Sequence, residues 1–110
     1  MNADLLRGAL ETVILEVIAE GRTYGYEIAK AIESRSAGAL LTQEGTLYPA
    51  LHRLEKRGLL AATWRDSPEG RPRKYYQLTA QGRKALEAGR KEWTAFTAAV
   101  NRILGLAYVG

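Results

Sequence analysis

The sequence predicts a mainly α-helical chain that contains one small β-hairpin and ends in a long helix. Three observations support this fold class. Apolar residues recur at helical spacing in three segments before residue 59. The pattern then changes to alternation on either side of a dense turn cluster, residues 66–70. The last segment carries an apolar seam whose steps alternate between three and four residues. A hairpin directly after a third helix predicts a winged helix-turn-helix domain followed by a C-terminal dimerisation helix.

The first two helices are expected over residues 5–20 and 24–36. In the first, Gly21 is a suitable stop. Its apolar stripe is broader than one contact requires, so we expect it to pack on its own domain and on a partner. Thr23 is expected to cap the second helix. The first stripe consists of Leu6, Leu10, Val13, Ile14, Val17 and Ile18, and the second of Tyr24, Ile28 and Ile32.

The third helix is expected to begin near Gly45 or Thr46, because the missing N–H of Pro49 costs least in the first turn. Gly58 is a suitable residue to end it. Its buried stripe is Leu47, Ala50, Leu51 and Leu54. The opposite face combines small residues at the start with cations further along, which suits close approach to a polyanion.

The hairpin is expected to place Leu60, Ala62 and Trp64 on one side of its first strand. Tyr76 and Leu78 should face inward from the second strand. Its tip, Arg71-Pro72-Arg73, is basic and suits insertion into a minor groove, where negative potential is concentrated. The alternative is an ordinary solvated hairpin.

Thr79 is expected to cap the last helix. The seam that follows has the period of a two-stranded coiled coil, and a small domain cannot bury all of it alone. A symmetric partner is the economical explanation, and packing on the first helix is the alternative. The seam residues are Leu86, Gly89, Trp93, Phe96, Val100, Ile103 and Ala107.

Composition restricts the function further. The 110 residues fit one compact unit, in which residues 1–79 form the winged-helix part and residues 80–110 the dimerisation helix. Eleven of the sixteen Lys and Arg lie between Arg53 and Lys91, an asymmetry typical of a nucleic-acid surface. The absence of cysteine excludes disulfides and thiolate chemistry. We also expect no catalytic residues, metal site or cofactor, no membrane span, and a cytoplasmic location.

Several motifs resemble those of the PadR family of bacterial transcriptional regulators, over about residues 5–90. They are Tyr24-Gly25-Tyr26-Glu27-Ile28, the run from Glu44 to Glu55, Gly58-Leu59, and the run from Gly70 to Gly82. At Tyr24 the family most often has histidine. The resemblance implies a short-subfamily repressor that binds a palindromic operator as a homodimer, with the third helix of each copy in a major groove. It also implies that the terminal helix crosses its partner's helix, where an aromatic pocket accepts flat hydrophobic effectors in some members.

These inferences give three sets of candidate residues. We expect double-stranded DNA to be contacted by Tyr24, Thr42, Gln43, Thr46, Tyr48, Arg53, Lys56, Arg71, Arg73, Lys74 and Tyr75. The expected dimer interface contains Leu6, Leu10, Leu86, Trp93, Phe96, Val100 and Ile103. Trp93 and Phe96 are also the candidates for a small aromatic effector, with plain interface packing as the alternative. A rival function is a winged-helix protein-interaction module that does not bind DNA.

Overall fold

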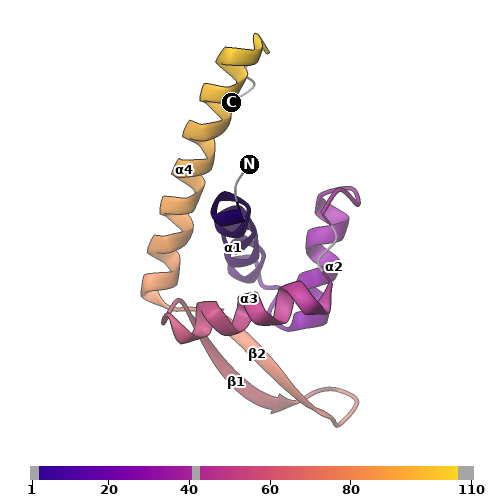
Figure 1. Ribbon diagram of the computed structural model, residues 1–110. Coiled ribbons are helices and arrows are strands. Elements are labelled where there is room, and N and C mark those ends of the chain that lie inside the picture. The colour runs from indigo at the N-terminus through magenta and orange to yellow at the C-terminus, as the bar shows by residue number, and fades with distance from the viewer. Residues whose placement is uncertain (1–2, 41–42, 107–110) are drawn as a thin grey trace.

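The computed structural model describes residues 3–40 and 43–106, apart from the side chains of residues 3–6 and Glu44. In this part of the chain, four helices and an antiparallel hairpin follow one another (Figure 1). Their bounds are α1 Ala3–Ala19, α2 Gly25–Arg35, α3 Glu44–Lys56, β1 Leu60–Asp66, β2 Pro72–Leu78 and α4 Ala80–Leu104. The predicted fold class is confirmed. Thr42, Ala107 and the side chain of Leu6 lie outside the described residues.

The core lies where α1, α2 and α3 meet above the base of the hairpin (Figure 1). The third helix, α3, buries all four of its predicted apolar residues. In the first two helices the predicted stripes are buried in part: Leu10, Val13 and Tyr24 are partly covered, and Leu15, which lies outside the predicted stripe, is buried. The fully buried large side chains are Ile14, Ile28, Ile32, Leu47, Leu51 and Leu54. The burial of this stripe fixes the rotation of α3, so its polar side must face outward.

The link between α1 and α2 differs from the expectation at Thr23. Gly21 ends α1 as predicted, in a left-handed conformation with φ of 102°. Tyr24, not Thr23, occupies the N-cap position of α2. The N–H of Thr23 donates to the Glu27 carboxylate at 2.8 Å, and its carbonyl accepts the Tyr76 N–H at 2.7 Å. The prediction that Thr23 caps α2 is therefore wrong, because this residue pairs with β2 and so holds the hairpin to the helical core.

The third helix begins at Glu44, slightly earlier than expected, and Pro49 lies in its second turn. Gly58 follows the end of the helix with φ of 79°, as predicted. The hairpin pairs Leu60 with Leu78 and Asp66 with Pro72 at its two ends. Because the strands run past the core, burial falls from Leu60 towards the tip.

Trp64 is the clearest departure in the hairpin. It was expected to lie on the same inward side as Leu60, yet its side chain is 66% exposed. Leu60, near the base, is buried. Trp64 pairs with Lys74 at a point where the strands have left the core, so alternation places it on the correct face but no core residues reach it.

The long helix α4 begins at Ala80 and is capped by Thr79, whose hydroxyl oxygen accepts the Gly82 N–H at 3.0 Å; this confirms the predicted cap. Its first half packs on α1 and its second half projects beyond the rest of the chain (Figure 1). This projection makes the molecule elongated, at 53 × 29 × 24 Å. Among the described residues, no helix is both long and apolar enough to cross a membrane.

Candidate nucleic-acid interface

The outer face of α3 is a polar surface free of intramolecular packing along most of its length. Thr46, Tyr48, His52 and Lys56 are all exposed on it, and Pro49 lies among them. Gln43 is exposed at the N-cap position, and its side chain makes no capping hydrogen bond. Hydroxyl, amide, imidazole and ammonium groups are therefore presented along one side of a helix, where they can meet base edges and phosphates.

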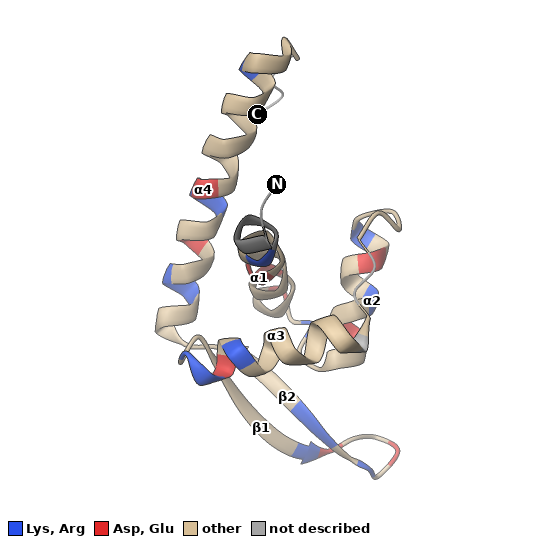
Figure 2. Cartoon of the chain, viewed as in Figure 1, with Lys and Arg blue, Asp and Glu red and all other residues tan. Residues whose placement is uncertain are grey.

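Positive charge surrounds this helix. Figure 2 shows Lys and Arg on both strands of the hairpin, at its tip and at the end of α3 nearest α4. Arg71 is exposed at the tip, and the tip is closed by a turn in which Ser67 and Arg71 pair through the backbone at 2.8 Å. The hairpin and α3 together form a cationic surface of the kind a DNA duplex attracts.

An ion pair joins the hairpin to α3. Lys74 Nζ donates to Glu55 Oε1 at 2.8 Å, and both side chains are largely covered. The Glu55 carboxylate that accepts this hydrogen bond raises the pKa of Lys74 above its ordinary value, so the ammonium stays charged. The contact fixes the hairpin against α3.

A second contact, built from arginine and tyrosine, joins the hairpin to the start of α2. The guanidinium of Arg73 lies 3.9 Å from the ring centroid of Tyr24, and Arg65 lies 4.2 Å from that of Tyr75. The two tyrosine rings meet edge to face at 5.8 Å. Arg73 also bonds to Glu69 at 3.2 Å and is only 26% exposed. Stacked cation–π pairs of this kind hold the arginine in place.

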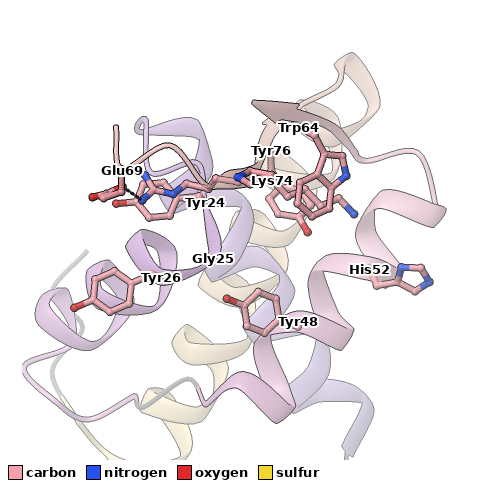
Figure 3. Close-up of a pocket in the computed structure, with 11 residues that line it drawn as sticks. Tyr24, Gly25, Tyr26, Tyr48, His52, Trp64, Glu69, Lys74 and Tyr76 are labelled. Atoms are coloured by element: carbon pink, nitrogen blue, oxygen red, sulfur yellow. Dashed lines mark hydrogen bonds and ion pairs between the residues drawn. The ribbon is translucent and has the colours of Figure 1, made fainter. Parts of the chain in front are cut away.

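Between α2, α3 and the hairpin lies an open hollow of about 690 Å³ (Figure 3). Tyr48 reaches across it towards the first turn of α2 (Figure 3). This approach depends on Gly25, since a Cβ there would lie 2.6 Å from the Tyr48 hydroxyl oxygen. Trp64 lines the same hollow from the hairpin. The hollow joins the outer face of α3 to the hairpin as one continuous concave surface.

The sequence model of the transcriptional regulator PadR-like family matches residues 14–88 of this chain. The chain belongs to this family. Among solved structures it resembles a transcriptional regulator from Clostridium thermocellum, with 34% identity and a TM-score of 0.81 over 91% of this chain and 97% of the other. A PadR-like transcriptional regulator from Bacillus cereus is 33% identical, with a TM-score of 0.77 over 93% and 97% of the two chains.

A curated relative is the transcriptional regulator YqjI of Escherichia coli K12, which is 35% identical over 85 residues. The match covers 77% of this chain and 39% of YqjI, so this chain spans less than half of that relative's length. The family and these relatives identify the chain as a PadR-like transcriptional regulator with a winged-helix fold.

In this PadR-like regulator, α4 uses its apolar seam in two different ways. Its first half contacts α1, where Gly89 allows such close approach that a Cβ would lie 2.1 Å from Thr12 Oγ1. Arg90 bonds to Glu16 of α1 at 2.6 Å beside that crossing. Leu10 and Leu86 pack on the edge of the core. The alternative of packing on the first helix therefore holds for the first half of the seam.

The second half of the seam faces solvent in the isolated chain. Trp93 is 43% exposed and Ile103 is 84% exposed, whereas Phe96 and Val100 are partly covered. The rings of Trp93 and Phe96 lie next to each other, with centroids 5.9 Å apart. These four residues share one apolar strip on the part of α4 that projects beyond the domain.

The structure places the predicted DNA-contact residues in three groups. Gln43, Thr46, Tyr48, Lys56 and Arg71 are exposed on α3 and at the tip of the hairpin. Tyr24, Arg73, Lys74 and Tyr75 are partly covered in the contacts that hold the hairpin in place. Arg53 is paired with Glu11 of α1.

Sequence reasoning missed three residues at this surface: Glu11, Glu55 and Trp64. The inward position of Glu11 could have been predicted, because it precedes the core residues Ile14 and Ile18 by three and seven positions and therefore lies on the same face of the helix. The pairing of Glu55 with Lys74 joins residues nineteen positions apart, which periodicity within one helix does not reveal.

Proposed function

We propose that this PadR-like regulator is a sequence-specific DNA-binding repressor that binds a palindromic operator as a homodimer. The observation that carries the proposal is the orientation of α3. All four residues of its apolar stripe are buried in the core, so its polar face is presented beside a hairpin rich in Lys and Arg. A helix presented in this way fits the major groove, and the hairpin beside it fits the backbone and the minor groove.

Different groups of residues would carry affinity and specificity. Gln43, Thr46 and Tyr48, at the start of α3, would read base edges or bind nearby phosphates, together with Thr42. Lys56 would bind phosphate, and Arg71 would enter the minor groove from the tip of the hairpin. The partly covered set of Tyr24, Arg73, Lys74 and Tyr75 would bind the DNA backbone while holding the hairpin at a fixed angle to α3.

The projecting half of α4 supports dimer formation. Its exposed apolar side chains would be covered by the same strip of a second copy, as an isologous interface requires. The interface would contain Trp93, Phe96, Val100 and Ile103, with Leu6, Leu10 and Leu86 at its edge. Residues 1–79 would then form the DNA-binding part, and residues 80–110 the dimerisation helix.

The adjacent rings of Trp93 and Phe96 support a further part of this proposal, in which a small flat aromatic effector binds between the two copies and releases DNA. An effector that binds the released form more tightly shifts the population away from the operator-bound form. Plain packing of the two rings at the interface is the competing explanation.

Binding can be tested by fluorescence anisotropy with a labelled duplex taken from upstream of the protein's own operon, compared with a scrambled duplex of the same composition. We expect tighter binding to the upstream duplex, with a stoichiometry of two chains per site. A reporter gene placed behind that duplex should be expressed less when the protein is present. Failure to bind either duplex at low salt would favour the rival function, a winged-helix protein-interaction module.

The effector site can be tested in a Trp64→Phe variant, in which Trp93 is the remaining tryptophan. Quenching of its fluorescence by planar aromatic compounds, together with weaker binding to DNA, would support the site. Loss of the quenching response in a Trp93→Phe variant of the otherwise unchanged chain is also expected. Quenching that persists there would assign the response to Trp64 and refute the site.

A further inference from the structure

Glu11 is a carboxylate placed between α1 and the end of α3. It lies on the side of α1 that also carries Ile14 and Ile18, and its side chain is only 13% exposed. Two arginines from α3 and its C-cap approach it. Arg57 Nη1 donates to Glu11 Oε1 at 2.9 Å, and Arg53 Nε lies 3.8 Å from Glu11 Oε2. One carboxylate therefore pairs with two cations that flank the outer face of α3.

The pairing is incomplete. Glu11 Oε2 and Arg53 Nε are both buried, face each other, and have no hydrogen-bond partner. A guanidinium carries five N–H donors, so each arginine keeps donors that Glu11 does not use. The side chains of Arg53 and Arg57 remain about half exposed, at 41% and 57%. Both can therefore reach an anion from solvent while Glu11 stays beneath them.

We propose that Glu11 is an internal counter-charge that limits how strongly the end of α3 binds DNA phosphates. This inference rests on the proposed function, because it assigns a regulator of affinity to the same surface. With Glu11 ionised, the cluster of Glu11, Arg53 and Arg57 has a net charge of +1. A phosphate that approaches the arginines is also repelled by the carboxylate beneath them.

The consequence concerns the sequence-independent part of binding. Phosphate contacts supply affinity that falls with salt but carry no sequence information. A built-in acid that weakens them shortens the residence of the protein on arbitrary DNA, because the lost contacts act on the dissociation rate. The base-reading residues at the start of α3 lie at the other end of the helix and are left unaffected.

The variant Glu11→Gln tests this inference, because glutamine keeps the shape and can still accept the hydrogen bond from Arg57. Binding to an arbitrary-sequence duplex should become roughly fivefold tighter at low salt. The slope of log affinity against log salt should steepen by about one unit. The matched control is Glu33→Gln, which removes an exposed acid of α2 away from this cluster and should change both values little.

A second background makes the test specific to the two arginines. In an Arg53→Gln/Arg57→Gln protein, adding Glu11→Gln should tighten binding clearly less than it does in the wild-type background, because only the direct repulsion between the carboxylate and the phosphates is then removed. Thermal unfolding of each variant shows whether the fold is intact. Binding of Glu11→Gln that is unchanged or weaker, or a gain of equal size in the double-arginine background, would overturn the proposal.

A heparin column keeps this result separate from the proposed function. If the wild-type chain binds no duplex at low salt, the DNA-binding proposal fails. The counter-charge is then judged by elution from heparin, which presents a polyanion without base pairs. Glu11→Gln should elute at higher salt than both the wild type and Glu33→Gln, and equal elution of all three would refute it.

Discussion

Replacing Gly82 with alanine should destabilise this protein, although alanine is the better helix former. Gly82 lies in the first turn of α4, where a Cβ would come within 2.1 Å of the Leu59 carbonyl oxygen. That oxygen belongs to the backbone at the start of the hairpin and accepts the Thr79 N–H at 3.1 Å. Relief of the clash therefore requires α4 to move away from the turn after α3.

The size of the effect follows from the contacts that this movement breaks. The Thr79 hydroxyl caps α4 at Gly82 and donates to the Gly58 carbonyl at 2.6 Å. Losing the cap costs about 1 kcal/mol, and each of two further hydrogen bonds costs about the same. The higher helix propensity of alanine stabilises α4 by about 1 kcal/mol relative to glycine. The net loss is roughly 2 kcal/mol, which corresponds to a melting temperature lower by about 10 °C.

Circular dichroism during thermal and urea unfolding, at one fixed protein concentration, measures this loss. The matched control is Gly45→Ala in α3, because a Cβ at Gly45 has no atom within 4 Å. That substitution should leave stability unchanged or raise it by up to about 1 kcal/mol. If Gly82→Ala proved as stable as Gly45→Ala, the close approach of α4 to the hairpin would not be what requires glycine at this position.

Three further results are expected from the same structure. Arg71→Ala should weaken DNA binding evenly across sequences and lower the salt slope by about one unit in anisotropy titrations, since its side chain is exposed at the tip. Ile103→Asp should convert a dimer into a 12.1 kDa monomer in light scattering, because it places a charge on the exposed apolar strip of α4; a dimer of unchanged mass would exclude the strip from the interface. Glu55→Gln should reduce the urea-unfolding free energy below pH 10.5, the ordinary pKa of lysine. The deficit relative to wild type should shrink as pH rises through the raised pKa of Lys74, and a constant deficit would show that the ion pair is not its cause.

Local patterns in the sequence were sufficient to predict the helices, their buried faces and several of their ends. The four apolar residues of α3 illustrate why: once they are buried, the helical repeat determines which side chains face outward. The end of α3 at Gly58 and the cap of α4 at Thr79 were also predicted correctly, because the requirements for ending and capping a helix involve only neighbouring residues.

Departures arose where distant parts of the chain meet. Thr23 resembles a helix cap, but its carbonyl pairs with Tyr76, more than fifty positions away. Trp64 lies on the face of the strand that alternation predicts, but the core does not extend far enough along the strand to cover it. The stacking of Arg73 on Tyr24 and the pairing of Glu11 with two arginines likewise depend on how α1, α2, α3 and the hairpin are arranged. The helices and the hairpin that carry the predicted surface were therefore predicted from the sequence, whereas the partners of their charged side chains required the structure.

The close contact of α1 and α4 at Gly89 fixes the angle at which the rest of α4 leaves the domain. From there to the end of α4 at Leu104 the helix extends about 22 Å, at 1.5 Å per residue. A tilt of α4 by about 5° at this contact would move the end of the helix by about 2 Å. A larger side chain at position 89 would change this angle. In the proposed dimer it would therefore alter the distance between the two α3 helices, without replacing any residue that is proposed to contact DNA. The half-site spacing that the proposed dimer tolerates would then depend on a glycine at the contact between α1 and α4.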